Sequence, residues 1–381
     1  MTNTNSLNTV GEKERTGRNL EVASVHLEGF RNYENETVRL GKGFNVLAGQ
    51  NAQGKTNFLE AIYLVSTTRL LRGQRDSDAI LQGATRAHVT VELDGSETKL
   101  SVVLEAGIRK RASINGLGLP RAADLIGRLP CVCVSSADMA IVRGEPADRR
   151  LFLDLELSAL YPGYLRHLTH YKRALEQRNA LLRDSREWMQ PPEMYEPWED
   201  QLSIHGSALR RARAEFVTQL EPFAIESHEK IGGGETIALC IEPKDPAIEP
   251  DELRNALVSS RHADVARGGS SVGPHRDDLG IKVGGRDGRS FGSQGQQRTA
   301  VISIKLAALG VIRRELGIPA LLLLDDILSD LDESRRSLLV DAVLEKAGQA
   351  VLTCTEASSA GKRILEYARV FQVDDGRVTE R

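Results

Sequence analysis

The stretch Gly49-Gln50-Asn51-Ala52-Gln53-Gly54-Lys55-Thr56 fits the pattern GxxxxGK(S/T), a glycine-rich loop that binds phosphates between a strand and a helix. An apolar run at residues 44–48 leads into it, and residues 58–65 carry an apolar stripe at helical spacing. The loop therefore has the context that phosphate binding requires, with backbone N–H groups and a helix N-terminus facing the anion. We expect Lys55 to reach the β- and γ-phosphates and the Thr56 hydroxyl to ligate Mg²⁺.

A second motif, Leu321-Leu322-Leu323-Leu324-Asp325-Asp326, lies near the other end of the chain. It reads as an apolar strand that ends in acids able to hold Mg²⁺, and the two motifs in this order predict a nucleotide site. We expect Asp325 to complete the Mg²⁺ shell and Asp326 to polarise the attacking water as the catalytic residue. Standing alone, the two acids would instead indicate a solvated strand end.

A third motif, Ser293-Gln294-Gly295-Gln296-Gln297, precedes a helix with an apolar stripe at residues 301–311. It resembles the signature sequence of the ABC-type ATPase clan, in which the serine and backbone N–H groups at a helix N-terminus contact the γ-phosphate held by the other subunit. The resemblance implies that Ser293, Gly295 and Gln296 act in trans and that ATP closes a homodimer. The stretch Leu328-Ser329-Asp330-Leu331-Asp332 resembles the D-loop of the same clan, which crosses this interface.

Further stretches resemble the RecF family of bacterial recombination mediators, and the resemblance covers roughly residues 20–378. They are Leu27-Glu28-Gly29-Phe30-Arg31-Asn32-Tyr33, Arg150-Leu151-Phe152-Leu153-Asp154, Tyr171-Lys172-Arg173-Ala174-Leu175, Gly273-Pro274-His275-Arg276-Asp277-Asp278-Leu279 and Ser293-Gln294-Gly295-Gln296-Gln297-Arg298-Thr299. The resemblance implies an ATP-dependent protein that binds gapped DNA or junctions between single-stranded and double-stranded DNA. It also implies cooperation with RecR and RecO in helping RecA load, and a part in DNA replication, repair, recombination and the SOS response.

The resemblance further implies a set of nucleotide contacts and a slow reaction. The predicted nucleotide-binding residues are Arg31, Gly49, Gln50, Asn51, Ala52, Gln53, Gly54, Lys55, Thr56 and Asn57. Two positions depart from the wider clan: Asp326 stands where a longer glutamate is usual, and Thr355 stands where many members carry a histidine. Because a shorter carboxylate and the lack of an imidazole position the attacking water less well, we expect slow hydrolysis, with ATP acting as a conformational switch.

Basic side chains in the middle of the chain are candidates for DNA contact. Residues 164–183 are helical in pattern, with apolar and basic side chains on opposite faces. The candidate contacts are Arg166, Lys172, Arg173 and Arg178. These residues could contact DNA phosphates, or they could form an ordinary solvated helix face. His275 and Arg276 follow a Gly-Pro turn and could approach nucleotide or DNA, although a lone histidine at a turn is more often structural.

Composition gives weaker constraints on function. The net charge of −3 provides no global basic field, although a local basic patch would suffice for nucleic-acid binding. The four cysteines lie in apolar runs without a CxxC pair, which favours buried thiols over a metal site or disulfides. The polar N-terminus has no apolar signal segment, and no apolar run is long enough to span a bilayer. We therefore expect a cytoplasmic protein without a membrane partner.

The order of strand and helix patterns divides the chain into four predicted parts. Residues 1–20 are polar and expected to be disordered, and residues 21–144 form strands around the phosphate loop. Residues 145–235 are mostly helical, and residues 236–381 return to strands and carry the signature and the acids. This order predicts an α/β fold: an ABC-type ATPase head with mixed sheets built from both chain ends, plus a helical insertion domain.

Two other functions are compatible with the same motifs. One is a chromosome-architecture ATPase of the SMC kind, but Pro191, Pro192 and Pro197 interrupt the insertion and argue against a long coiled-coil arm. The other is the ATP-binding subunit of a transporter. Such subunits usually place their signature closer to the phosphate loop, and nothing in this sequence resembles a membrane-coupling surface.

Overall fold

The computed structural model describes residues 20–71, 73–95, 97–188, 190–328, 331 and 333–381, and these form two compact units. The first, which we call the head, comprises residues 20–139, Glu226–Gly234 and Arg298–Arg381. The second, which we call the helical unit, comprises Ala140–Ile225 and Glu235–Gln297. The predicted tail at residues 1–20 lies outside the described residues except for Leu20. No helix in the described part of the chain is long and apolar enough to cross a membrane.

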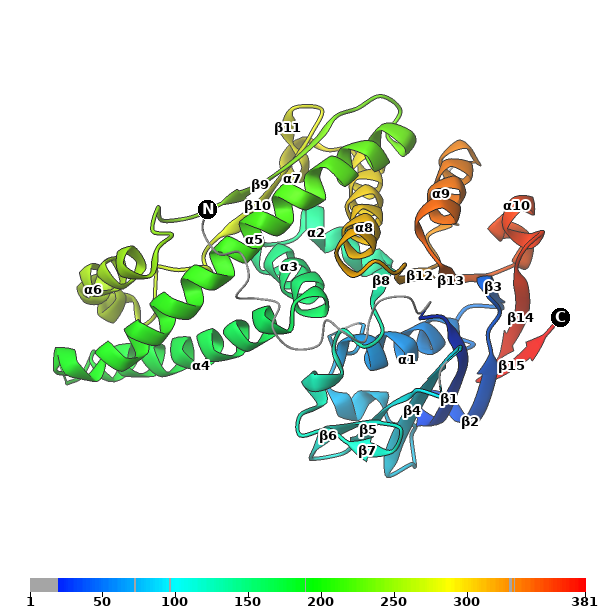
Figure 1. Cartoon of the computed structure of the whole chain (residues 1–381), viewed down its shortest axis with the longest axis horizontal. Coiled ribbons are helices and arrows are strands. Elements are labelled where there is room, and N and C mark those ends of the chain that lie inside the picture. Colours follow the sequence, from blue (N-terminus) through cyan, green and yellow to red (C-terminus); the bar gives the residue numbers. More distant parts are fainter. Residues whose placement is uncertain (1–19, 72, 96, 189, 329–330, 332) are drawn as a thin grey trace. The chain divides into compact units, whose positions relative to one another are not determined.

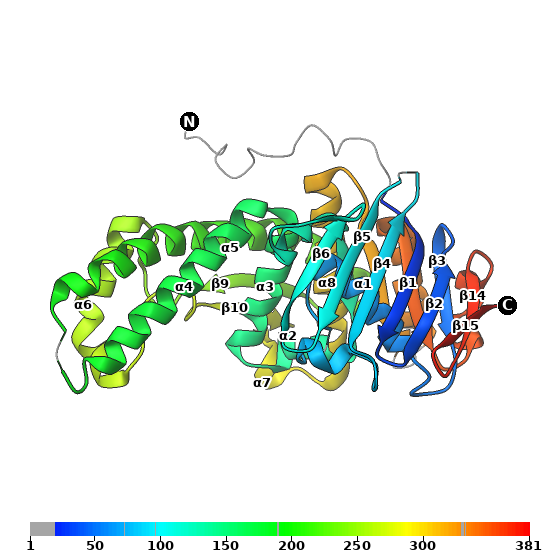
Figure 2. The same cartoon turned by 90° about the horizontal axis from the view of Figure 1, so that it is seen from below.

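The head contains a six-stranded antiparallel sheet in the order β2-β1-β4-β5-β6-β7, which is seen face-on in Figure 2. Its strands are β1 (Val22–Phe30), β2 (Tyr33–Arg39), β4 (Arg86–Leu93), β5 (Lys99–Glu105), β6 (Ile108–Ile114) and β7 (Leu117–Gly118). Along β4 every second side chain is buried, the period expected when one face of an antiparallel sheet is covered.

A second six-stranded sheet of the head has the order β15-β14-β3-β13-β12-β8. Its strands are β3 (Gly43–Ala48), β8 (Cys131–Val134), β12 (Leu321–Asp325), β13 (Gln349–Cys354), β14 (Arg369–Asp374) and β15 (Arg377–Glu380). All neighbours pair in parallel except β14 and β15, which form an antiparallel edge. Because β3 and β8 come from the first part of the chain and β12 to β15 from the last, the predicted head built from both chain ends is confirmed.

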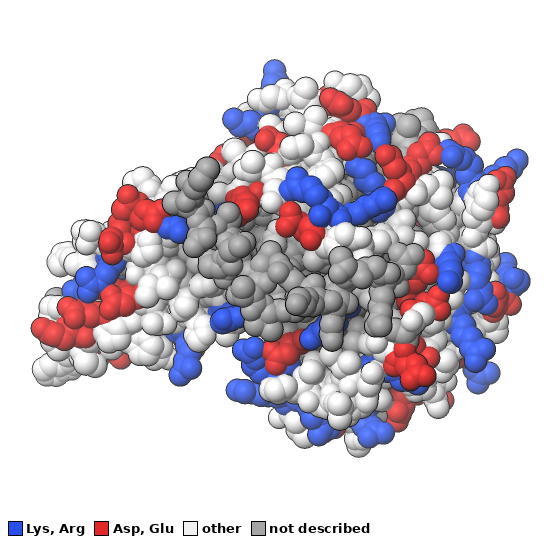
Figure 3. Space-filling view, viewed as in Figure 1, with Lys and Arg blue, Asp and Glu red and all other residues white. Residues whose placement is uncertain are grey.

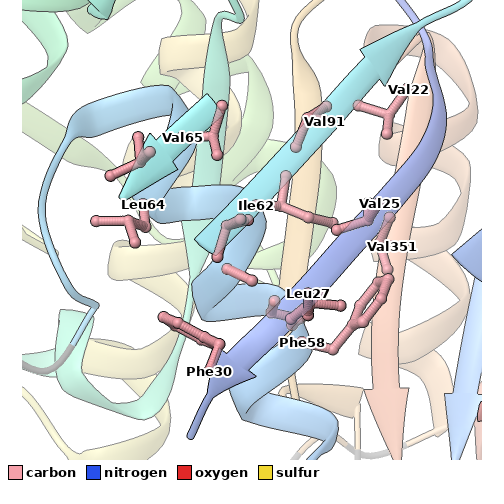
Figure 4. Packing of buried hydrophobic residues seen from close by; sticks show 14 of the residues in the cluster. Val22, Val25, Leu27, Phe30, Phe58, Ile62, Leu64, Val65, Val91 and Val351 are labelled. Atoms are coloured by element: carbon pink, nitrogen blue, oxygen red, sulfur yellow. The ribbon is translucent and has the colours of Figure 1, made fainter. Parts of the chain in front are cut away.

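Helix α1 (Lys55–Thr67) connects the two sheets of the head through a shared apolar core. Its side chains interleave with those of β1 and β4 in Figure 4, and the same cluster includes Leu323 of β12 and Val351 of β13. A helix covered on both sides is apolar around most of its circumference, as the buried residues of α1 show. The head's other elements are η1 (Asp76–Ala79), η2 (Ala122–Leu125), η3 (Ser136–Met139), α9 (Glu333–Lys346), η6 (Ala357–Ala360) and α10 (Lys362–Leu365).

The helical unit has its own three-stranded antiparallel sheet, β11-β10-β9, and a set of helices (Figure 1). The strands are β9 (Ile237–Glu242), β10 (Asp278–Val283) and β11 (Arg286–Asp287). The helices are α2 (Ala140–Arg143), α3 (Pro146–Leu160), α4 (Pro162–Asp184), η4 (Pro192–Met194), α5 (Glu196–Ile231), α6 (Pro250–Arg267) and α7 (Gly288–Phe291). Helix α5 ends in the head, and α8 (Gln294–Leu316) begins in the helical unit and continues into the head.

The division between the units differs from the boundary that the sequence predicts at residue 236. Residues 235–297 belong to the helical unit, because β9 pairs with β10 rather than with a strand of the head. Helix α6 is also tied to α4 by a buried ion pair between Arg178 and Asp264, 2.8 Å apart. The strand-like pattern that begins after residue 236 belongs to the small sheet of the helical unit. Periodicity alone does not show to which sheet a strand belongs, so the sequence assigned these residues to the head.

Arg178 of α4 is fully buried, and this corrects its assignment as a DNA contact. Its Nε donates to Glu199 of α5 at 3.2 Å, and its Nη1 donates to Asp264 of α6 at 2.8 Å. Its Nη2 donates to the carbonyl of Leu257 at 2.8 Å, also on α6. With 0% of the residue exposed, the guanidinium joins three helices and does not meet solvent or DNA. The sequence suggested a DNA contact because it does not show that Glu199 and Asp264, far along the chain, lie beside Arg178.

Replacing Arg178 should therefore destabilise the fold. We expect Arg178→Ala to lower the free energy of unfolding by about 3–5 kcal/mol, because Glu199 and Asp264 would stay buried after losing the guanidinium that lies between them. The matched control is Arg166→Ala on the exposed face of the same helix, which should change stability by about 0.5 kcal/mol or less. Urea denaturation of both variants measures the difference, and an Arg178→Ala protein as stable as the control would contradict the structural role.

Candidate nucleotide-binding site

The phosphate loop, residues 49–56, opens onto a cavity of the head of about 280 Å³. The cavity is lined by Asn51, Ala52, Gly54, Lys55, Thr56, Asn57, Asp326 and Thr353. Six of these eight were predicted as nucleotide-binding residues and Asp326 as the catalytic one. Thr353 carried no predicted role. The structure thus brings seven of the predicted residues, from both parts of the chain that build the head, to one cavity.

Two glycines of the loop occupy positions where a side chain would not fit. Gly54 has a φ of +117°, and a Cβ there would lie 2.8 Å from the amide nitrogen of Asn32. At Gly49 an added Cβ would run into the carbonyl oxygen of Val373. The glycines therefore let the loop pass close to the β1–β2 turn and to β14, as a tight phosphate-binding turn requires.

Two turns outside the motif hold the loop in place. In the turn between β1 and β2, the Asn32 amide donates to the carbonyl of Gln53 and the Tyr33 hydroxyl to that of Gly54, both at 3.0 Å. In the turn between β14 and β15, the backbone N–H of Asp375 donates to the Gln53 side chain at 2.7 Å. The sequence did not predict that Asn32, Tyr33 and Asp375 hold the loop, although Asn32 and Tyr33 lie in a stretch that resembles the RecF family.

Lys55 lies folded over the loop. Its Nζ donates to the carbonyl oxygens of Gly49 at 2.6 Å and Gln50 at 2.7 Å, and the residue is 7% exposed. Burial lowers the pKa of the Lys55 ammonium, and the neighbouring Asp326 carboxylate acts in the opposite direction. The cation is therefore held at the cavity by weak carbonyl acceptors, which a phosphate oxygen would outcompete as a charged acceptor.

Asp325 of β12 meets Thr56 across the chain. The Thr56 hydroxyl donates to Asp325 Oδ1 at 2.7 Å, and the Thr353 hydroxyl donates to the same atom at 3.0 Å. Thr353 Oγ1 also accepts the backbone N–H of Asp326 at 2.9 Å, where the chain has a left-handed φ of +52°. Parallel pairing of β12 with β13 places Thr353 directly beside Asp325. Thr353 thus holds the carboxylate of Asp325 and the backbone of Asp326, and Thr355 lies just beyond the end of β13.

The oxygen atoms of Thr56 and Asp325 fit a magnesium ion. Adjacent oxygen ligands of an octahedral Mg²⁺ ion with bonds of about 2.1 Å are roughly 2.9 Å apart, close to the 2.7 Å between these two atoms. Within the described residues, no group of three or more His, Cys, Asp or Glu is arranged to hold a metal. Further ligands would have to come from nucleotide phosphates and water, the usual coordination of Mg²⁺ in ATPases.

Arg31 does not line the cavity, although it was predicted to bind nucleotide. Its Nε donates to Glu60 of α1 at 2.8 Å, and its Nη1 donates to the carbonyl of Asp78 at 2.7 Å. Glu60 is 1% exposed, so this ion pair fixes the β1–β2 turn against α1. The structure therefore assigns Arg31 a supporting position behind the residues that hold the loop.

The signature residues form an exposed helix N-terminus in the helical unit. Ser293 Oγ accepts the backbone N–H of Gln296 at 3.3 Å, and the Gln296 side chain accepts the N–H of Ser293 at 2.6 Å. This reciprocal cap begins α8 and leaves Ser293 exposed. The side chain of Gln296 also donates to Glu235 at 2.6 Å. Of the D-loop resemblance, Ser329, Asp330 and Asp332 lie outside the described residues.

The remaining DNA candidates differ in their surroundings. Arg166 and Arg173 are exposed on the outer face of α4, whereas Lys172 lies 3.5 Å from Asp154. His275 Nε2 donates to the Ser270 carbonyl at 3.0 Å, which leaves Nδ1 to accept from the Tyr171 hydroxyl at 2.7 Å, and burial lowers the pKa of His275 to about 4. The His275 imidazole is therefore neutral near pH 7, as expected for a histidine with a structural role. In Figure 3, Lys and Arg alternate with Asp and Glu over the face in view.

Removing the Thr353 hydroxyl should leave Asp325 and Asp326 less firmly positioned without disturbing the fold. We expect Thr353→Val to weaken Mg²⁺-dependent nucleotide binding by about 10-fold or more, the usual effect of losing a hydrogen bond to a metal ligand. Calorimetric titration with nucleotide, with and without Mg²⁺, measures it. Thr218→Val is the control, because the Thr218 hydroxyl donates to the carbonyl of Ala214, one turn earlier on its own helix and away from the nucleotide cavity. Equal Mg²⁺-dependent affinity in both variants would contradict the role of Thr353.

The chain is similar to known proteins over most of its length. The family model described as RecF/RecN/SMC N terminal domain matches residues 21–379. The DNA replication and repair protein RecF of Synechococcus sp. (strain JA-3-3Ab) is 38% identical over 367 residues, 93% of this chain and 96% of that protein. The protein of the same name from Shouchella clausii (strain KSM-K16) is 37% identical over 371 residues, 94% of this chain and 98% of that protein.

Solved structures place the fold in the same group. The recombination mediator protein RecF-ATP of the RecFOR pathway superposes with a TM-score of 0.86 at 28% identity, covering 95% of this chain and 98% of that one. A Smc head domain from Pyrococcus furiosus, at 16% identity and a TM-score of 0.56, shares the fold alone; it covers 95% of this chain and 96% of that one. The family match and the curated relatives together show that the chain belongs to the RecF family.

Proposed function

We propose that this protein is an ATP-dependent DNA-binding protein of recombinational repair, in which ATP closes a homodimer on gapped or junction DNA. The observation that carries the proposal is the cavity lined by the phosphate loop and Asp326, with Asp325 bonded to Thr56 of the loop, in a chain of the RecF family. The similar solved structure is that of a recombination mediator, RecF-ATP, of the RecFOR pathway. Hence RecR and RecO are the proposed partners, RecA the indirect one, and the cytoplasm, where the bacterial chromosome lies, the proposed location.

The proposed closure uses one ATP molecule as a bridge between two copies. On one copy, the loop N–H groups and Lys55 hold the phosphates, while Thr56 and Asp325 would hold Mg²⁺, which neutralises phosphate charge when bound. On the other copy, Ser293 offers its exposed hydroxyl at the N-terminus of α8, which carries the positive end of a helix dipole. A γ-phosphate between the two is attracted from both sides, so each copy completes the other copy's site.

Hydrolysis in the proposed cycle is slow and serves to reopen the dimer. Asp326 lines the cavity, but its side chain is one methylene shorter than a glutamate. Thr355, which follows β13, offers no imidazole to hold the attacking water. Because general-base catalysis depends on the position of that water, a poorly held water extends the life of the closed state.

For DNA contact, the exposed Arg166 and Arg173 of α4 remain the proposed residues. Arg178 is excluded by its burial, and Lys172 is partly neutralised by Asp154. Charges of both signs alternate on the face in Figure 3, so the proposed contact is a local one that recognises phosphates rather than a protein-wide field.

Sedimentation velocity with Mg²⁺ and ATP tests the dimer. The wild-type protein should form a dimer that also sediments with gapped duplex DNA, whereas Lys55→Ala should bind ATP about 10- to 100-fold more weakly and stay monomeric. Ser293→Arg should bind ATP normally and yet stay monomeric, since a bulky cation would occupy the γ-phosphate contact. Thermal unfolding checks that both variants are folded. Normal dimerisation of either variant would contradict the proposed site.

A further inference from the structure

Phe291 is an exposed aromatic residue beside the signature motif. It ends α7, and 68% of its surface is exposed, while the other seven phenylalanines of the chain are buried or half-buried. A single exposed apolar residue is common and proves nothing alone. Its position matters, because only one residue, Gly292, separates it from Ser293.

The turn that carries Phe291 is held in place by several hydrogen bonds. Asp287 accepts the backbone N–H of Ser290 at 2.7 Å. The buried side chain of Gln297 donates to the carbonyls of Gly288 at 2.9 Å and Arg289 at 3.2 Å, and accepts a hydrogen bond from Arg143. The ring therefore projects from a fixed support, and binding through it loses little conformational entropy.

Phe291 lies within the surface that a partner covers when it contacts Ser293. Two residues span at most about 7 Å of extended chain, so a partner that contacts Ser293 also covers the surroundings of Phe291. In the closed dimer that partner is the second copy, whose Asn51 and Ala52 form the exposed rim of its phosphate loop. Ala52 has a left-handed φ of +66° and an apolar methyl group at this rim.

We propose that Phe291 is an apolar anchor of the ATP-closed homodimer, seated on the second copy beside its phosphate loop. The inference rests on the proposed function, since it needs a dimer that ATP closes. Aromatic side chains that become fully covered at the centre of an interface contribute more to binding than their polar neighbours. Phe291 thus adds a hydrophobic contribution to a contact otherwise made of phosphate charge, and this part of the affinity should resist salt.

The dimerisation constant of Phe291→Ala measures this contribution. With saturating Mg²⁺ and ATP, the variant should dimerise at least about 10-fold more weakly than the wild-type protein, as expected when a buried phenyl ring is removed. Its monomer should bind ATP as the wild-type monomer does. Phe291→Leu should recover part of the loss. The matched control is Trp188→Ala, which removes another aromatic residue of the helical unit, 78% exposed, and should dimerise normally.

A photo-reactive phenylalanine analogue at position 291 gives a second, independent readout. Illumination should produce a covalent dimer with ATP and none without it, joined to the peptide that carries the phosphate loop. Unchanged dimerisation of Phe291→Ala, crosslinks only within one chain, or a loss confined to DNA binding would each overturn the inference while leaving the proposed function intact. A wild-type protein that stays monomeric with ATP would instead overturn the proposed dimer, and the inference with it.

Discussion

The hydrogen bond between the Thr56 hydroxyl and the Asp325 carboxylate, 2.7 Å long, is the contact that joins the two halves of the nucleotide site. It joins residues 269 positions apart and brings both halves of the nucleotide site together. The sheet makes it possible, because β3 and β12 both run parallel to the β13 strand between them. Parallel strands end at the same edge, so the loop after β3 and the acids after β12 meet there.

The site at this edge of the sheet is polar and charged rather than apolar. The cavity is lined by small and polar residues together with Lys55, and phosphate is the ligand that such a lining suits. Ser293 caps a helix in the other compact unit, with its hydroxyl exposed. In the proposed dimer the γ-phosphate lies between the loop of one copy and the N-terminus of α8 of the other, so nucleotide would control association.

The sequence predicted what depends on local pattern and missed what depends on distant partners. The phosphate loop, the acids after an apolar strand and the two faces of α4 follow from spacing, and the structure contains them. Arg178 was misassigned because its acids lie on α5 and α6, and the helical periodicity of α4 carries no information about them. Thr353 was missed for the same reason, since only strand pairing shows that it touches Asp325.

The most direct test of the central claim, that two copies complete each other's nucleotide sites, is to mix Lys55→Ala with Ser293→Arg protein and measure the mass in Mg²⁺ and ATP. A mixed dimer contains one intact site, built from the loop of the Ser293→Arg copy and the signature of the Lys55→Ala copy. We predict that the mixture forms a dimer holding one ATP while each variant alone stays monomeric. A mixture that stays monomeric at concentrations where the wild-type protein dimerises fully would contradict the account.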